Sequence, residues 1–196
     1  DYGVPQNRLR AFFVAIRKDF KETFDFRKLN KKPKVTVKEA IGELYDLDKN
    51  PKHTLKTKPQ NKYLKYLRKE NQVIYNHEIK YPAQLTQDRI SYVPQGGNWA
   101  DIPTELFPNN RTNRHSSAFK RLDEQACSVT IDTGNAHSNY FHPLFNRIPT
   151  VREAARIQSF KDSFILEGSR TSQYRQIGNA VPPLPVSYTH LRAHET

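Results

Sequence analysis

The chain has 196 residues, a formal net charge of +12 and a pI near 9.8. Hydrophobic residues make up 36% of it and the mean hydropathy is −0.84, which predicts a modest core with long solvated loops. One cysteine excludes a disulfide framework and fits a reducing interior, and neither a membrane-spanning apolar run nor a signal-peptide pattern is present. The basic charge favours a polyanionic partner, nucleic acid first, over a merely solvated surface.

The amino-terminal segment, residues 8 to 17, is a β-branched and aromatic run that predicts a strand with Phe12, Val14 and Ile16 on one face. Side chains two residues apart share a strand face, so Gln6, Arg8 and Arg10 should point the same way. Two neighbouring arginines need an anionic or strongly polar partner, and salt bridges at a sheet edge are the structural alternative to a functional role.

The middle of the chain alternates short helical patterns with lysine-rich or polar loops. Thr36 and Glu39 form a capping box that predicts a helix over 37–46. Further helices are expected over 63–70 and 82–92, and a turn at 96–99 leads into another short helix. Loops are expected over 19–34, 48–62 and 108–116, and extended pieces over 119–122 and 128–131.

The carboxy-terminal part contains a second capping box, Thr150 and Glu153, which predicts a helix over 151–159. Cys127 has no proline before it, and we interpret it as a small, partly buried residue rather than a nucleophile. The tail has the character of non-native sequence. His190 and His194 have the spacing of a metal pair, but no further ligand supports them, so no metal site is predicted.

Two blocks carry a family resemblance: DYGVPQNRLRAFFVAIR, residues 1 to 17, and RIPTVREAARIQSFKDSFILEGSRTSQYRQIGNAVPPLP, residues 147 to 185. Together they resemble the DNA (cytosine-5) methyltransferases, in family order, at the two ends of a variable middle. The first resembles the strand motif before the target-recognition domain, and the second resembles the family's last two motifs. The resemblance implies an α/β fold: the C-terminal fragment of an S-adenosylmethionine-dependent Rossmann-like methyltransferase with a small mixed α+β target-recognition domain.

The same resemblance divides the chain into four parts and implies a reaction. Residues 1–18 would end the catalytic sheet, 19–146 would form the target-recognition domain, 147–186 would hold the return helix and cofactor-pocket segment, and 187–196 would be a non-native tail. The family transfers a methyl group from S-adenosylmethionine to C5 of a flipped cytosine, after a cysteine thiolate adds to C6. That cysteine and the glycine-rich cofactor loop lie upstream of the region matched here, so we expect this chain to be inactive alone.

The resemblance also implies site residues at both ends of the chain. Gln6, Arg8 and Arg10 would belong to the catalytic site, with Arg10 on the carbonyl oxygen of the flipped cytosine and Arg8 helping to hold the phosphate and the catalytic loop. Gly178, Asn179 and Ala180 would close over the methionine part of the cofactor. An anchoring motif would join the two domains, with an exposed helix-surface ion pair as the alternative: Arg147, Thr150, Arg152, Glu153, Arg156 and Gln158.

Candidate DNA-reading residues lie in the middle, beside a threonine followed by an aliphatic residue that is typical of the family's recognition domains. Five of them can hydrogen-bond base edges, although phosphate contacts or plain solvation are equally compatible with them: Asn98, Arg111, Asn113, Arg114 and His115. The threonine and the aliphatic residue, also predicted to bind DNA, are Thr130 and Ile131. The lysines of residues 52–69 are better suited to phosphate.

The partner expected for the parent enzyme is double-stranded DNA, and no membrane is involved. We expect a monomeric parent in the bacterial cytoplasm, with a possible cognate restriction endonuclease in the same restriction–modification system. Two alternatives stay open: a non-catalytic DNA-binding module, or one subunit of a split methyltransferase. Methylation of transfer RNA by the same fold is a third, which the long basic middle disfavours.

Overall fold

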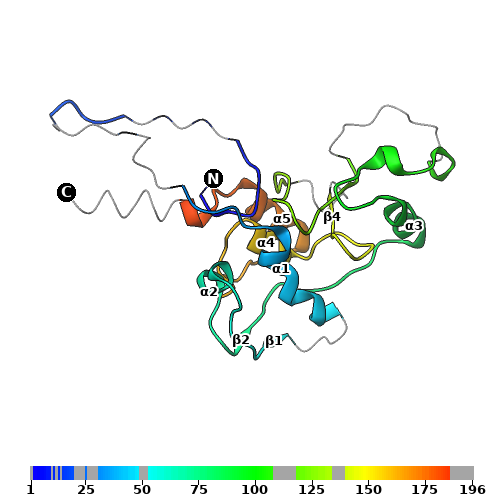
Figure 1. Ribbon diagram of the computed structural model, residues 1–196, viewed down its shortest axis with the longest axis horizontal. Coiled ribbons are helices and arrows are strands. Elements are labelled where there is room, and N and C mark those ends of the chain that lie inside the picture. Colours follow the sequence, from blue (N-terminus) through cyan, green and yellow to red (C-terminus); the bar gives the residue numbers. More distant parts are fainter. Residues whose placement is uncertain are drawn as a thin grey trace.

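The computed structural model describes residues 2–9, 11, 13, 15–19, 25, 31–48, 53–107, 118–133 and 140–185. Short helices and loops surround a central group of helices, and a helical lobe extends from one side of it (Figure 1). The sheets within the described residues are two small two-stranded ones, β1 with β2 and β3 with β4. No helix in this part of the chain has the length and apolar character needed to cross a bilayer.

Helix α1 (Val37–Ile41) begins at the predicted capping box. The Thr36 hydroxyl accepts a hydrogen bond from the Glu39 amide at 3.2 Å, and the Glu39 carboxylate accepts one from the Thr36 amide at 2.8 Å. The chain continues as the 3₁₀ helix η2 (Gly42–Asp48), so the predicted helix over 37–46 is confirmed with a tighter second half. Val37, Ala40 and Ile41 are fully buried.

Helices α4 (Val151–Ile157) and α5 (Arg170–Asn179) complete the central group, where α1 packs on α4 and α4 on α5. The capping box of α4 is present as predicted. Helix α5 was not anticipated from the sequence. It begins at Ser169, whose hydroxyl accepts from the Ser172 amide at 3.3 Å. The central core is built from helix and loop side chains, including Tyr63, Leu64, Leu67, Leu122, Ile131, Tyr140, Tyr174 and Ile177.

A second region contains helix α2 (Lys62–Leu67) with strands β1 (Thr54–Leu55) and β2 (Gln72–Val73), which pair antiparallel. The predicted short basic helix is therefore confirmed at 62–67, with Asn61 as its N-cap. A small apolar cluster of Leu44, Leu47, Leu55 and Ile74 joins η2 to this sheet.

The lobe to the side consists of α3 (Gln84–Tyr92) and the 3₁₀ helices η3 (Trp99–Asp101) and η4 (Thr104–Leu106). Val93, Ile102 and Phe107 form its own small core. Strand β3 (Lys120–Arg121) pairs in parallel with β4 (Tyr140–Phe141) and leads from this lobe into the central core. The helix predicted over 82–92 and the turn with a short helix after it are confirmed.

The amino-terminal segment differs from its prediction. Its described residues contain no strand; they form isolated parallel bridges from Tyr2 to Lys32 and from Gln6 to Ser128. Leu9 and Phe13 are 94% and 97% exposed, so no surface of the described chain covers this apolar run. A strand needs a neighbouring strand to bond its backbone groups, and none of the described segments lies in that place. Phe12 and Val14 lie outside the described residues.

Candidate functional site

Residue Ile131 lies where the amino-terminal segment, the middle of the chain and helix α5 meet. Its backbone amide donates to Gln6 Oε1 at 2.7 Å, and Gln6 Nε2 donates to Gln158 Oε1 at 2.7 Å. Gln158 Nε2 in turn donates to the Ile177 carbonyl in the last turn of α5, at 2.8 Å. Both glutamine side chains are buried, so these hydrogen bonds are shielded from water. The low dielectric of the interior makes them stronger than they would be in water.

Arg8 makes a second connection between the same two places. Its Nη1 donates to the Ile131 carbonyl at 3.0 Å, and its Nη2 donates to the Gly178 carbonyl at 2.9 Å. The Gly178 carbonyl belongs to the C-terminal turn of α5, where carbonyl groups lack helical partners and a cation is favourable. Gln6, Arg8 and Gln158 are called the Gln-Arg clamp below.

The clamp is possible because two backbones touch. A Cβ atom at Gly178 would lie 2.4 Å from the Asp132 carbonyl carbon and 2.5 Å from the Thr133 amide nitrogen. No side chain fits at that distance, so glycine is the residue that lets the end of α5 approach the peptide bond between residues 132 and 133. Gly178 was predicted to close over the cofactor; among the described residues it lies against the backbone of residues 132 and 133.

The anchoring motif forms a buried ionic network. The Arg147 guanidinium binds the Glu153 carboxylate through two nitrogens, at 2.8 Å and 2.9 Å, and both side chains are fully buried. Burial by itself would raise the pKa of the Glu153 carboxyl, but Arg147 beside it holds that pKa well below the ordinary range. The same carboxylate accepts from the Thr150 amide at 2.7 Å, so one group caps α4 and pairs with Arg147.

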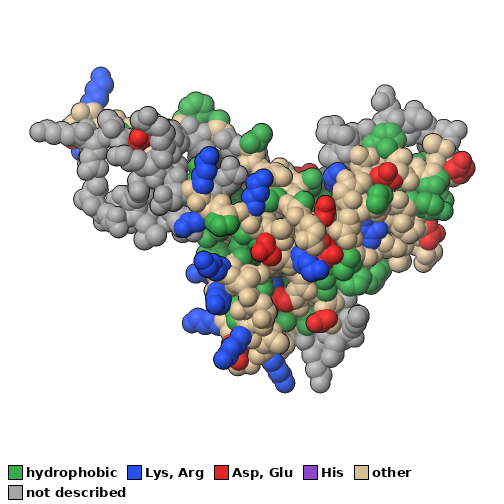
Figure 2. Space-filling view, viewed as in Figure 1, with side chains coloured by type: hydrophobic (Ala, Val, Ile, Leu, Met, Phe, Trp, Pro, Cys, Tyr) green, Lys and Arg blue, Asp and Glu red, His purple; other side chains and the backbone are tan. Residues whose placement is uncertain are grey.

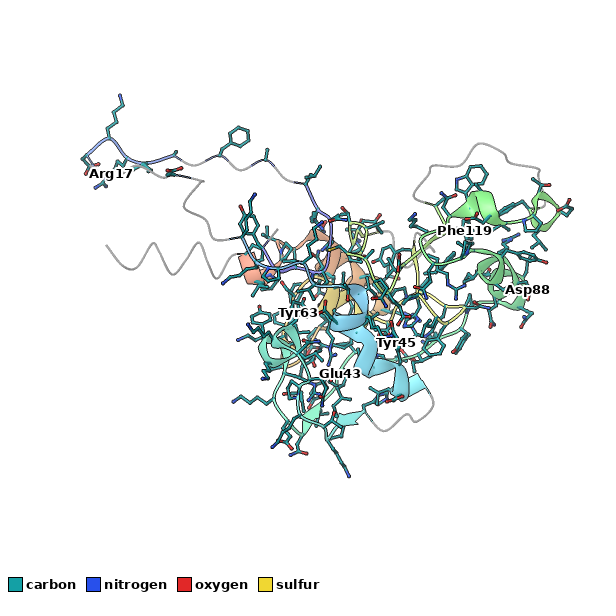
Figure 3. The ribbon with its side chains drawn as sticks, in the orientation of Figure 1. Arg17, Glu43, Tyr45, Tyr63, Asp88 and Phe119 are labelled. Atoms are coloured by element: carbon teal, nitrogen blue, oxygen red, sulfur yellow. The ribbon has the colours of Figure 1, made fainter. Side chains whose placement is uncertain are left out.

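Arg152 and Arg156 extend from α4 to neighbouring elements. Arg156 binds Asp162 at 2.6 Å and Glu43 of η2 at 2.8 Å (Glu43 is labelled in Figure 3). Arg152 donates to the carbonyls of Tyr75 at 2.9 Å and Phe164 at 2.6 Å. Both arginines are fully buried, so the alternative of an exposed helix-surface ion pair is wrong.

Two buried histidines lie beside this network. His142 Nδ1 accepts from the amides of Leu144 and Phe145, both at 3.1 Å, so the ring proton is on Nε2, which lies 3.6 Å from Glu153 Oε1. His77 Nδ1 lies 2.8 Å from the Thr150 hydroxyl. Burial lowers the pKa of His142 to about 3 and that of His77 to about 4.

The predicted DNA-reading residues lie in different surroundings. Asn98 caps η3, accepting from the Ala100 amide at 2.9 Å. Thr130 is partly exposed and its hydroxyl donates to the Asn7 carbonyl at 2.9 Å. Ile131 is fully buried, so its side chain is not available at the surface. Four further candidates lie outside the described residues, together with the loop predicted over 108–116: Arg111, Asn113, Arg114 and His115.

Basic side chains gather away from the α3 lobe. In Figure 2 most of the visible lysines and arginines lie over the amino-terminal segment and the α2 and β1–β2 region, whereas acidic side chains are more frequent over the rest of that face. Exposed lysines there are Lys56, Lys58, Lys62, Lys65 and Lys69. A surface of one charge sign suits a polyanion backbone.

Arg121 is a buried residue that the sequence did not reveal. Its guanidinium donates to the carbonyls of Ile90 and Val93 at the C-terminal end of α3, at 3.1 Å and 3.0 Å, and to the Pro143 carbonyl at 3.0 Å. Burial lowers its pKa. The sequence around Arg121 gives no sign of this, because its acceptors belong to distant segments: three are backbone carbonyls and one is Asn146 Oδ1, at 3.2 Å.

The proposed cofactor residues end α5. Gly178 is buried, Asn179 is exposed and Ala180 is partly buried, with the Ala180 amide donating to the Ile177 carbonyl at 3.2 Å. The Asn179 amide therefore lies at the surface with both donor and acceptor capacity.

Cys127 is partly buried and its thiol donates to the Val35 carbonyl at 3.4 Å, which agrees with its prediction as a packing residue. Arg10, His190 and His194 lie outside the described residues. Within the described residues, no group of acidic, cysteine and histidine side chains could hold a metal ion.

Known proteins with similar sequences are DNA methyltransferases. The chain is 32% identical to the type II methyltransferase M.DdeI of Desulfomicrobium norvegicum, over 94% of this chain and 49% of that protein. It is 31% identical to M.Eco47II of Escherichia coli, over 92% of this chain and 40% of that protein. The chain thus spans less than half the length of these relatives.

A solved structure shares the fold. It is a prophage-encoded Escherichia coli protein described as a DNA modification methyltransferase, with a TM-score of 0.69 and 24% identity. The likeness covers 96% of this chain and 55% of that one. The family described as C-5 cytosine-specific DNA methylase matches residues 1–192. The extent of this match, together with the two relatives, shows that the chain belongs to the C-5 cytosine-specific DNA methylase family.

Proposed function

We propose that the chain is the DNA-recognising, C-terminal half of a DNA (cytosine-5) methyltransferase of a restriction–modification system. The observation that carries this proposal is the Gln-Arg clamp. It joins the amino-terminal motif, predicted to be catalytic, with the Thr130–Ile131 segment, predicted to bind DNA, and the end of α5, predicted to bind the cofactor. Its most distant partners, Arg8 and Gly178, lie 170 positions apart in the sequence. A DNA-binding module without catalysis has no need to hold its cofactor segment against its base-reading segment.

Duplex DNA is the proposed substrate. The net charge of +12 and the exposed lysines near α2 favour a polyanion, and the lobe of α3, η3 and η4 carries Asn98 at its surface. Phosphate contacts would supply affinity, while Thr130, Asn98 and the candidates at 111–115 would supply base discrimination of about 1–3 kcal/mol for each good pair.

The proposed roles at the active site follow from the family resemblance and, for Asn179, also from the exposure of its side chain. Arg10 would bind the carbonyl oxygen of the flipped cytosine and stabilise charge that develops on the ring. S-adenosylmethionine supplies the methyl group when bound, and the exposed Asn179 amide fits hydrogen bonds to the polar groups of its methionine part. The thiolate that adds to cytosine C6 would come from the amino-terminal half, since Cys127 is a packing residue.

Complementation tests the proposal. Residues 1–196 are expressed with the polypeptide encoded directly upstream of Asp1, in a host without cytosine methylation, and 5-methylcytosine is mapped by bisulfite sequencing. We expect methylation of one short sequence only when both polypeptides are present. Arg10→Ala should abolish it, whereas Arg17→Ala, which removes an exposed ion pair with Asp19 in the same segment, should preserve it.

A different result would point to another function. DNA binding by the chain with no methylation in the presence of the upstream polypeptide would favour the non-catalytic DNA-binding module. Methylation restored by separately expressed halves, where the gene encodes them as two proteins, would favour a natural split enzyme.

A further inference from the structure

Both backbone groups of Ile131 are connected to the end of α5 by side chains from the amino-terminal segment. The Ile131 amide reaches the Ile177 carbonyl through Gln6 and Gln158, and the Ile131 carbonyl reaches the Gly178 carbonyl through Arg8. These parallel connections hold the backbone at residue 131 at a fixed distance from the last turn of α5.

Direct contact supports the same junction. The peptide bond between residues 132 and 133 lies so close to Gly178 that a methyl group would not fit between them. Neither segment can therefore move toward the other, and the clamp opposes their separation. A packed contact of this kind transmits a displacement rather than absorbing it, because protein interiors are not continuously deformable.

We propose that Gln6 and Arg8 are positioning residues that couple base reading at Thr130 to cofactor binding at residues 178–180. The proposal rests on the proposed function, which assigns DNA to the first segment and S-adenosylmethionine to the second. Order imposed on either segment by its ligand reaches the other through the clamp, so each ligand raises the affinity for the other by the same factor.

Arginine suits this position for a geometric reason. Two carbonyl oxygens of different segments repel each other, and a planar guanidinium can donate to both with separate nitrogens. A lysine at residue 8 keeps the positive charge but has a single nitrogen, so it would hold the two carbonyls less firmly. Arg8→Lys is therefore the informative partial variant beside Arg8→Ala.

Hydrogen exchange on the 196-residue chain tests the coupling without any ligand. A guanidinium has no acceptor, so Arg8 is not the hydrogen-bond partner of the Ile131 amide, which donates to Gln6. If the clamp is one unit, Arg8→Ala will accelerate exchange at residues 129–133 and 177–180 together, by about tenfold, and leave α1 and α4 protected. Arg8→Lys should give an intermediate rate, and Arg17→Ala in the same segment should change neither region.

The results that overturn the coupling are specific. Acceleration at only one of the two regions would show that they open independently. Acceleration that includes α1 and α4 equally, for Arg8→Lys as well as Arg8→Ala, would show that Arg8 supports the whole fold rather than the junction.

A second measurement uses the complete methyltransferase proposed above. The dissociation constant for DNA is measured with and without S-adenosylhomocysteine. We expect S-adenosylhomocysteine to lower this constant about tenfold in the unchanged protein and in Arg17→Ala. Arg8→Ala should bring this ratio close to one. An unchanged ratio in Arg8→Ala, or no effect of S-adenosylhomocysteine in the unchanged protein, would overturn the coupling. A protein that binds neither DNA nor S-adenosylhomocysteine would instead overturn the proposed function, while the hydrogen-exchange result would still decide whether the junction is one unit.

Discussion

Charged residues in and just before α4 are buried, although burying a charge is costly. Arg147 before the helix, and Arg152, Glu153 and Arg156 within it, have no exposed surface, although the spacing of the three helical residues suits an exposed helix. Each ion must recover several kcal/mol of lost hydration from its partners, so removing one partner costs more than the pair itself contributes. The buried arginines instead specify which loops lie against α4, because their donors need acceptors at fixed positions.

Replacing Glu153 with glutamine should be strongly destabilising. The change leaves Arg147 buried without a carboxylate, so we expect a loss of about 3–5 kcal/mol in the free energy of unfolding, measured by urea denaturation at pH 7. Glu78→Gln, which removes an exposed partner of Lys80 at 3.0 Å, is the matched control and should cost about 0–1 kcal/mol. Equal losses in the two variants would contradict the argument.

At the scale of elements, Arg121 connects the α3 lobe to the central core. Ile90 is the one buried residue of helix α3. Apolar packing of the helix therefore contributes little to holding α3 in place. The Arg121 guanidinium instead satisfies carbonyls at the C-terminal end of α3 and at Pro143 beyond β4. A cation at the negative end of a helix is stabilised there, which offsets part of the cost of its burial.

Arg121→Met should release the α3 lobe selectively. Methionine fills similar volume but removes the guanidinium donor from the Val93 and Pro143 carbonyls, at a cost of about 1–3 kcal/mol for each carbonyl left unsatisfied. The Ile90 carbonyl keeps the Val93 amide as a donor. Amides of α3 should lose most of their protection in native-state hydrogen exchange, while those of α1 and α4 keep theirs. The exposed Arg175→Met on α5 is the control. Protection lost evenly across the molecule would show that α3 and the core open as one unit.

At the scale of the whole molecule, buried neutral histidines make stability depend on pH. His142 cannot accept a proton on Nδ1 without losing two hydrogen bonds from backbone amides, and burial lowers its pKa to about 3 and that of His77 to about 4. The unfolded chain takes up protons on both near pH 6.5, where the folded chain does not. Between pH 6.5 and about 4 the unfolded state therefore binds more protons, and stability falls as the pH falls.

We expect the free energy of unfolding to decrease by up to about 1.4 kcal/mol per pH unit for each of these histidines as the pH drops below 6.5. Urea denaturation between pH 7 and pH 5 measures it, above the range where carboxylates titrate. The double variant His77→Gln with His142→Asn should flatten the dependence. A profile of the double variant parallel to that of the unchanged protein would refute this assignment.

The sequence by itself determined the local structure and the family of this protein. Capping boxes at Thr36 and Thr150, the short basic helix after Asn61 and the packing role of Cys127 depend on neighbouring residues, and the structure confirms them. Helix α5 was missed because its pattern is weakly amphipathic, although Ser169 after Gly168 was a usable start signal.

Only the tertiary structure decided how these parts act together. It placed Arg8 on two backbone carbonyls, Gly178 against the peptide bond between residues 132 and 133, and Arg121 at the end of α3. It also gave the described residues of the run over 8–17 no neighbouring strand, although the composition of the run predicts one. Any residue can supply a backbone acceptor or a strand partner, so the sequence does not mark which residue will do so. These partners also come from segments far apart in the chain. A sequence pattern therefore records which side chains need partners, and folding alone determines which partners they meet.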